Sequence, residues 1–164
     1  MKICSVKPEK QRIILVDGYL DEPSCLGVPP YISPQIRYAY GALLDLGIPP
    51  EHITFVTIDE LRKAKAKYHE LALSAHAVVV IAGATVPGRY LGGRPISLEE
   101  ITRLAGDIRP VPLLLGGPIV LCKADVPGVA HMCGEIAATS LQALLGGRRE
   151  PAPHEHDGWV ELIN

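Results

Sequence analysis

Residues that could bind a ligand gather in two long segments of this sequence. The first, DGYLDEPSCLGVPPY at positions 17–31, holds a carboxylate at Asp17 and a thiol at Cys25. The second, GATVPGRYLGGRP at positions 83–95, holds four glycines together with Arg89 and Arg94. A thiol can act as a nucleophile, and arginines can pair with a phosphate or a carboxylate. The plainer interpretations are a loop cap for Asp17, a small loop residue for Cys25 and surface charge for the arginines.

Glycine also follows two later runs of apolar residues. Gly116, Gly117 and Pro118 follow one run, and Gly134 with Glu135 follows the next. Glycine after four of the apolar runs indicates that the backbone must approach a flat or bulky group closely. Tight turns are the alternative at any single position, but the four together predict a rim that binds a ligand.

Two pairs of residues have the side chains that bind metals. His131 and Cys133 alternate at the end of an apolar run, so both could face one ion. A buried polar pair is the more common role for such residues. His154, Glu155 and His156 look like a metal-binding set but lie in a polar, proline-containing segment, which favours a solvated linker. The sequence therefore predicts no metal site.

The elements that must position these residues alternate along the chain. Continuous apolar runs of strand length occupy residues 12–17, 53–57, 76–82, 111–115 and 128–132. Continuous apolarity indicates burial on both faces, as in parallel sheets. The sequence thus predicts an α/β fold, a flavodoxin-like doubly wound sheet of five parallel strands in the order 2-1-3-4-5. Ligands of such sheets bind outside the carboxyl ends of the strands, where both long segments begin.

Helix signals separate the strands. Ser33 followed by proline predicts one helix start, and capping boxes at Thr57 and Ser97 predict two more. A last helix is predicted over residues 135–145, and a short or broken helix within residues 117–127. The basic run of the second helix is predicted to face solvent; it consists of Arg62, Lys63, Lys65 and Lys67.

Composition limits the class of protein. The chain has 164 residues, of which 48% are hydrophobic, enough for the core of one domain. A formal charge of −2 excludes the basic footprint of a nucleic-acid binder, and the apolar runs are too short to cross a membrane. Four cysteines without paired spacing favour a reducing, cytoplasmic setting. No GxGxxG follows the first strand and no GxxxxGK[ST] occurs, which excludes the two common phosphate-binding fingerprints.

The chain divides near residue 147. Residues 1–147 are predicted to form the α/β domain, and residues 148–164 a linker with the start of a further segment. The linker RREPAPHEHDG is polar and contains prolines, and WVELI after it begins a new strand-like alternation. A strand that opens so near the last residue predicts that the chain is the N-terminal piece of a longer protein.

Two stretches, VDGYLDEPSCLGVPPYISP and VVVIAGATVPGRYLGGRPIS, resemble the N-terminal cobalamin-binding-like domain of archaeal radical S-adenosylmethionine proteins. The Gly-Gly-Pro at positions 116–118, followed by Gly134 and Glu135, resembles the same domain. The resemblance covers residues 12–163. It implies a corrinoid lying across the strand ends, with its nucleotide tail beside the sheet.

The resemblance also implies which residues meet the cofactor. Gly116 and Gly117 would border the nucleotide tail, and Gly83, Ala84 and Thr85 would lie near the corrin or its tail. Cys25 could approach an axial position of the cobalt. The predicted cofactor-binding set is Asp17, Gly18, Cys25, Gly83, Ala84, Thr85, Gly116, Gly117, Pro118, Gly134 and Glu135.

Two motifs of that family are missing. The first loop lacks the histidine of the DxHxxG motif, which supplies the lower cobalt ligand in many cobalamin domains. The chain also lacks CxxxCxxC, so a [4Fe-4S] cluster and S-adenosylmethionine would belong to a downstream catalytic domain of the same polypeptide. This chain is therefore predicted not to be catalytic by itself.

Two classes of function remain open. The first is a binding module that presents a corrinoid to a radical S-adenosylmethionine domain, or a degenerate module that only covers it. With methylcobalamin bound, the reaction would be methyl transfer or another radical modification. The second is a small stand-alone α/β enzyme or a domain that binds a nucleotide or phosphorylated metabolite, using Asp17, Cys25, Arg89 and Arg94.

Overall fold

The computed structural model describes residues 7–18, 34–83, 94–122, 126–131 and 145 of the chain. Five strands form one parallel sheet in the order β2-β1-β3-β4-β5. The strands are β1 (Ile13–Asp17), β2 (Ile53–Thr57), β3 (Ala77–Ile81), β4 (Leu113–Gly116) and β5 (Val129–His131). The helices are α1 (Pro34–Asp45), α2 (Ile58–Lys63), α3 (Lys65–Ser74) and α4 (Leu98–Asp107), with short 3₁₀ helices η1 (Pro8–Lys10), η2 (Pro50–His52) and η3 (Pro118–Cys122).

The predicted flavodoxin-like α/β arrangement is confirmed. Each strand begins and ends within two residues of its predicted limits, and the strand order is the predicted one. The 3₁₀ helix η3 takes the place of the short helix predicted within residues 117–127. The helix predicted over residues 135–145 lies outside the described residues, apart from Leu145.

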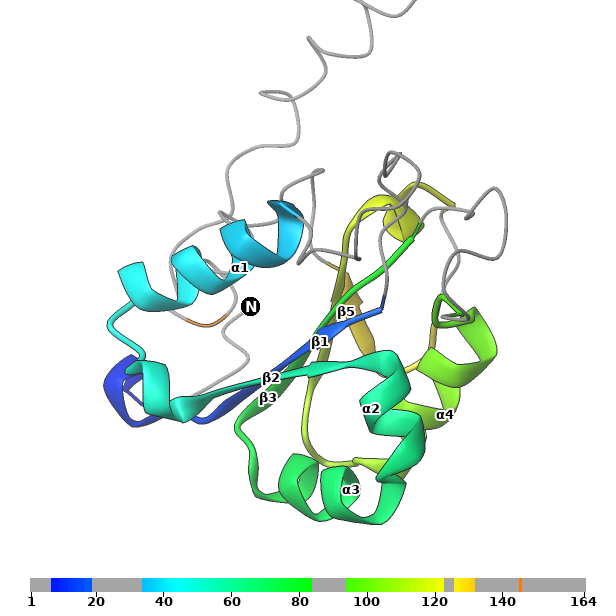
Figure 1. The fold of residues 1–164 in the computed structure, drawn as a ribbon, viewed down its shortest axis with the longest axis horizontal. Coiled ribbons are helices and arrows are strands. Elements are labelled where there is room, and N and C mark those ends of the chain that lie inside the picture. Colours follow the sequence, from blue (N-terminus) through cyan, green and yellow to red (C-terminus); the bar gives the residue numbers. More distant parts are fainter. Residues whose placement is uncertain (1–6, 19–33, 84–93, 123–125, 132–144, 146–164) are drawn as a thin grey trace, which may run out of the picture.

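The helices cover both faces of the sheet (Figure 1). α1 lies on one face, while α2, α3 and α4 lie on the other. Right-handed crossovers require this division. The connection through α1 crosses the sheet from β1 to β2, whereas those through α2, α3 and α4 cross it in the opposite direction.

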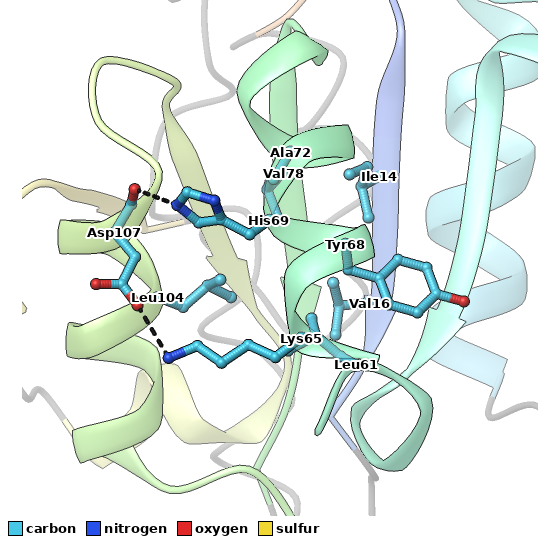
Figure 2. Close-up of a pocket in the computed structure, with 10 residues that line it drawn as sticks. All are labelled: Ile14, Val16, Leu61, Lys65, Tyr68, His69, Ala72, Val78, Leu104 and Asp107. Atoms are coloured by element: carbon cyan, nitrogen blue, oxygen red, sulfur yellow. Dashed lines mark hydrogen bonds and ion pairs between the residues drawn. The ribbon is translucent and has the colours of Figure 1, made fainter. Parts of the chain in front are cut away.

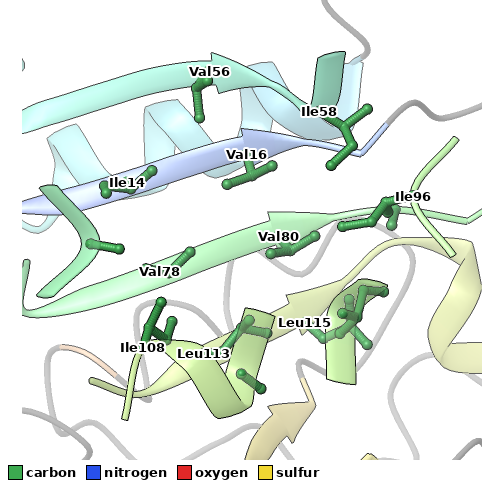
Figure 3. Close-up of a cluster of buried hydrophobic side chains, with 14 of the residues drawn as sticks. Ile14, Val16, Val56, Ile58, Val78, Val80, Ile96, Ile108, Leu113 and Leu115 are labelled. Atoms are coloured by element: carbon green, nitrogen blue, oxygen red, sulfur yellow. The ribbon is translucent and has the colours of Figure 1, made fainter. Parts of the chain in front are cut away.

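Alternate residues of the central strands fill two separate cores. Ile13 and Leu15 of β1 pack on the α1 side, whereas Ile14 and Val16 pack on the side of α2, α3 and α4, as Figure 3 shows for the second core. Every residue of β1 and β3 is buried, since both faces are covered. Burial on both faces explains why these strands are apolar at consecutive positions.

Both predicted capping boxes are confirmed. The Thr57 hydroxyl accepts the Glu60 N–H at 3.3 Å, and the Glu60 carboxylate accepts the Thr57 N–H at 2.9 Å. Ser97 and Glu100 make the same reciprocal pair at the start of α4, at 3.2 and 3.0 Å. These local contacts satisfy N–H groups that a helix start leaves without partners.

One helix was expected between β2 and β3, and the structure has two. The chain leaves the helical conformation at Ala64, where φ is −121° and ψ is 44°. A continuous helix from residue 58 to residue 74 would be about 25 Å long, but a five-residue strand spans only about 17 Å. The break at Ala64 folds the connection to a length that matches the sheet.

A cavity of about 30 Å³ lies between α3, α4 and the sheet (Figure 2). Its walls are mostly apolar and include Val78, Ala72 and Leu104. At its rim, Lys65 pairs with Asp107 (Nζ to Oδ2, 3.5 Å), and a His69 ring nitrogen lies 3.0 Å from the Asp107 carbonyl oxygen. The volume suits a water molecule or one methyl group, so this cavity is too small for a cofactor.

Neighbouring residues of β3 offer a matched test of this packing. Val78→Ile adds one methylene on the side of the cavity, and we expect it to raise the free energy of unfolding by about 0.5–1 kcal/mol. Val79→Ile adds the same group on the opposite face, where Val79 is fully buried. We expect this substitution to lower the free energy of unfolding by about 1–3 kcal/mol. Urea denaturation followed by circular dichroism measures both. Equal losses would show that the cavity cannot accept a side chain.

Candidate functional site at the ends of the parallel strands

The carboxyl ends of β1, β3 and β4 lie side by side at one edge of the sheet. Asp17 pairs with Ile81 of β3, and Ile81 pairs with Gly116 of β4. The structure therefore brings together six of the predicted cofactor-binding residues: Asp17, Gly18, Gly83, Gly116, Gly117 and Pro118.

The segments that leave β3 and β4 are joined through their backbones. The Ala82 N–H donates to the Gly116 carbonyl at 2.9 Å, and the Ile119 N–H donates to the Ala82 carbonyl at 3.1 Å. Gly83 and Gly117 have positive φ angles of 121° and 88°. A Cβ on Gly117 would lie 2.5 Å from the Ala82 oxygen, and one on Gly83 would collide with the Ile119 backbone. The protein's own backbone therefore requires glycine at both positions.

Gly18 joins β1 to the same edge. Its N–H donates to the Ile81 carbonyl at 2.8 Å, and its carbonyl accepts the Ile96 N–H at 3.0 Å. A Cβ on Gly18 would lie 2.6 Å from Cγ2 of Ile96. The segment 19–33 thus departs from the sheet beside the point to which the segment 84–93 returns.

These contacts give the glycines a different explanation from the predicted ligand rim. At Gly18, Gly83 and Gly117 the close neighbour is the protein itself, so no ligand is needed to account for glycine. Gly116 and Gly117 are buried, and Asp17 is only 5% exposed. These residues form a floor beneath the strand ends and do not line an open cradle.

The remaining predicted residues cannot be placed at this edge. Five members of the cofactor-binding set lie outside the described residues: Cys25, Ala84, Thr85, Gly134 and Glu135. The same holds for Arg89, Cys133, His154 and His156. Arg94 is described and its side chain is exposed.

Arg62 is the residue near this edge whose predicted position is wrong. Lys63, Lys65 and Lys67 are exposed as expected, but the Arg62 side chain is only 22% exposed. Its guanidinium donates to both carboxylate oxygens of Glu100, at 2.9 and 2.8 Å, in the bidentate geometry that suits arginine.

Three further hydrogen bonds complete the surroundings of Arg62. The guanidinium donates to Asp59 at 2.9 Å and to the carbonyls of Arg94 and Pro95 at 2.6 and 3.1 Å. Arg94 and Pro95 directly precede Ile96, which is bonded to Gly18. Arg62 therefore fixes α2, the start of α4 and the point where the segment 84–93 rejoins the fold. Its partner Glu100 is 38 residues away in the sequence, and no local sequence pattern predicts an ion pair over that separation.

The ion pair changes the acidity of Glu100. Hydrogen bonds from Arg62 hold the pKa of this carboxyl well below its usual value, at about 2, with help from the Ser97 N–H. The carboxylate in turn raises the pKa of Arg62. Glu100 therefore stays ionised down to acid pH while the domain is folded.

Within the ranges that the structure describes, no three His, Cys, Asp or Glu side chains lie close enough to hold a metal ion. Among those same residues, no helix has both the length and the apolar character needed to cross a membrane.

The chain is similar to two archaeal proteins, each described only as uncharacterized. The protein of Archaeoglobus fulgidus is 47% identical over 110 residues, which are 67% of this chain and 20% of that protein. The protein of Methanocaldococcus jannaschii is 37% identical over 108 residues, which are 65% of this chain and 19% of that protein. The chain therefore spans about a fifth of the length of these relatives. No family model matches the chain, and no solved structure matches it.

A single methyl group tests the backbone contact at the strand ends. We expect Gly117→Ala to lower the free energy of unfolding by about 2 kcal/mol or more, because its φ is positive and its Cβ would press on the Ala82 oxygen. Gly41→Ala is the matched control, since Gly41 lies within α1 with nothing near its Cβ position. The control should gain about 0.5–1 kcal/mol. Chemical denaturation measures both, and a neutral Gly117→Ala would contradict the contact.

The Arg62 pair predicts a pH-dependent loss of stability. A carboxyl with a lowered folded pKa stabilises the fold above its unfolded pKa, here about 4.5, and loses that contribution as the pH falls toward 2. We expect Arg62→Met to cost about 1–2 kcal/mol at pH 7, a figure reduced because Glu100 is 31% exposed and partly screened. The difference from the parent should shrink between pH 4.5 and pH 2.

Lys63→Met is the control for this measurement. Lys63 neighbours Arg62 on α2 and is exposed, so its substitution should change stability by no more than about 0.5 kcal/mol. A gap between Arg62→Met and the parent that stays constant from pH 7 to the acid range would show that Glu100 is not the partner responsible.

Proposed function

We propose that this chain is an accessory domain of a longer protein and that the carboxyl ends of its strands face the rest of that protein. The observation that carries the proposal is the hydrogen bond from Ile96 to Gly18. It places Gly18, which precedes the segment 19–33, beside Ile96, which follows the segment 84–93, so both long segments connect to the sheet at one edge. The coverage of the relatives, about a fifth of their length, supports the longer protein.

The resemblance to cobalamin-binding-like domains supplies the proposed class of partner. It implies that the strand ends face a radical S-adenosylmethionine domain in the same polypeptide. A corrinoid held between the two would supply methyl transfer through its cobalt. This chain would then contribute binding and orientation.

Two forms of this module are possible: a loaded form that holds a corrinoid, and a covering form that only covers the partner domain. The described residues fit the covering form better. Other atoms of the chain fill the space beside Gly18, Gly83 and Gly117. Gly116 and Gly117 are also buried. A corrinoid would have to be held by residues outside the described part. We therefore propose a domain that covers its partner without a corrinoid of its own. The stand-alone enzyme has less support, because Asp17 is 5% exposed and presents no open carboxylate.

An anaerobic titration with hydroxocobalamin tests the covering form. We expect this chain and the full-length relative from Archaeoglobus fulgidus to leave a desalting column without corrin absorbance, because the floor of the site is closed by backbone. Corrin retained by the relative would contradict the covering form and establish the loaded one. Gly117 variants are unsuitable here, since they should unfold the strand ends whether or not a corrinoid binds.

The partner class has its own test. The four fifths of the relative outside the matched region should contain CxxxCxxC, because three thiolates leave one iron of the cluster open for S-adenosylmethionine. If the motif is absent, the radical S-adenosylmethionine partner is excluded. The accessory role would then require a partner domain of another class.

A further inference from the structure

The outer edge of β2 has an unusual composition for an exposed edge. Within the described residues β2 is the last strand on its side of the sheet, and its sequence ITFVT consists of β-branched and aromatic residues. Natural edge strands commonly carry charged residues, proline or a bulge that prevents further pairing. The strand contains no charge and no proline, and Phe55 is 37% exposed. These features indicate an edge that another strand covers.

The opposite edge is a poorer template. β5 has three residues, Val129–His131, whereas β2 has five. Phe55 pairs in register with Leu15 of β1, which belongs to the core on the α1 side. A strand added outside β2 would therefore place a side chain next to Phe55 on the face that α1 covers.

The chain itself contains a segment that suits this edge. Residues 159–163, Trp-Val-Glu-Leu-Ile, are as many as β2 contains and are rich in residues that favour strands. Trp159 is the single tryptophan of the sequence. When all five residues pair with β2, Trp159 lies diagonal to Phe55 on the same face, within reach of an aromatic side chain, and cross-strand aromatic pairs are worth about 0.2–1 kcal/mol.

The connection from Leu145 to residue 159 is long enough to reach the outer edge of β2. Leu145 is fully buried in the core on the α1 side, where its carbonyl accepts the Gln11 side-chain N–H at 3.4 Å. Residues 146–158 can span about 40 Å when extended. The outermost strands of a five-stranded sheet lie only about 20 Å apart, so the tether reaches the β2 edge from Leu145.

We propose that residues 159–163 add a sixth strand to the sheet along the outer edge of β2, with Trp159 packed against Phe55. The added strand pairs the outward-facing backbone groups of β2 and covers the Phe55 ring. This inference is independent of the proposed function, since it concerns the edge of the sheet and not the ends of its strands.

Fluorescence of the single tryptophan tests the proposal directly in the full 164-residue chain. We expect a blue-shifted emission and slow quenching by acrylamide, because Trp159 would be partly buried. Phe55→Glu should shift the emission to the red and raise the quenching constant several-fold. Leu73→Glu is the matched control, because Leu73 is an exposed apolar residue on α3, 45% exposed, and it should leave both readings unchanged.

Circular dichroism establishes that each variant is folded, and Phe55→Ala provides a milder substitution if the charge disturbs the sheet. Emission and quenching in the parent chain equal to those of free N-acetyltryptophanamide would overturn the proposal. An unchanged spectrum in both Phe55 variants would overturn it as well. A blue shift that disappears on dilution would assign the edge to a second copy of the chain instead.

Discussion

Burial of β1 and β3 on both faces is the constraint on which the rest of this structure depends. A strand covered on both sides must be apolar at every position, and it must receive helices from both directions. Right-handed crossovers satisfy that demand only when α1 lies on one face and α2, α3 and α4 lie on the other. The same geometry gathers the carboxyl ends of β1, β3 and β4 at one edge.

Contacts within the chain's own backbone hold that edge together without a ligand. Gly83 and Gly117 let the segments after β3 and β4 approach each other, and Gly18 admits Ile96. Arg62 then holds the carbonyls just before Ile96, so one guanidinium links two helices to the edge. These contacts explain why glycine alone is an ambiguous sign of a cofactor.

Local signals predicted their elements well because each depends on residues close in sequence. Thr57 with Glu60 and Ser97 with Glu100 are three residues apart, and both form the reciprocal caps that their types predict. The position of Arg62 was missed because Glu100 lies 38 residues away on another helix. The break at Ala64 was missed for a related reason. It depends on the length of the sheet that the connection must cross, and no residue near Ala64 encodes that length.

The sequence by itself determined the fold class, the strand order and the edge of the sheet from which the long segments leave, because apolar periodicity and chain handedness leave few alternatives. Only the tertiary structure decided what the glycines at that edge are for. A glycine indicates that some group comes close to the backbone, but the identity of that neighbouring group depends on which segments the fold brings together. Here the near neighbours of Gly83 and Gly117 are Ile119 and Ala82, a pairing fixed by the adjacency of β3 and β4.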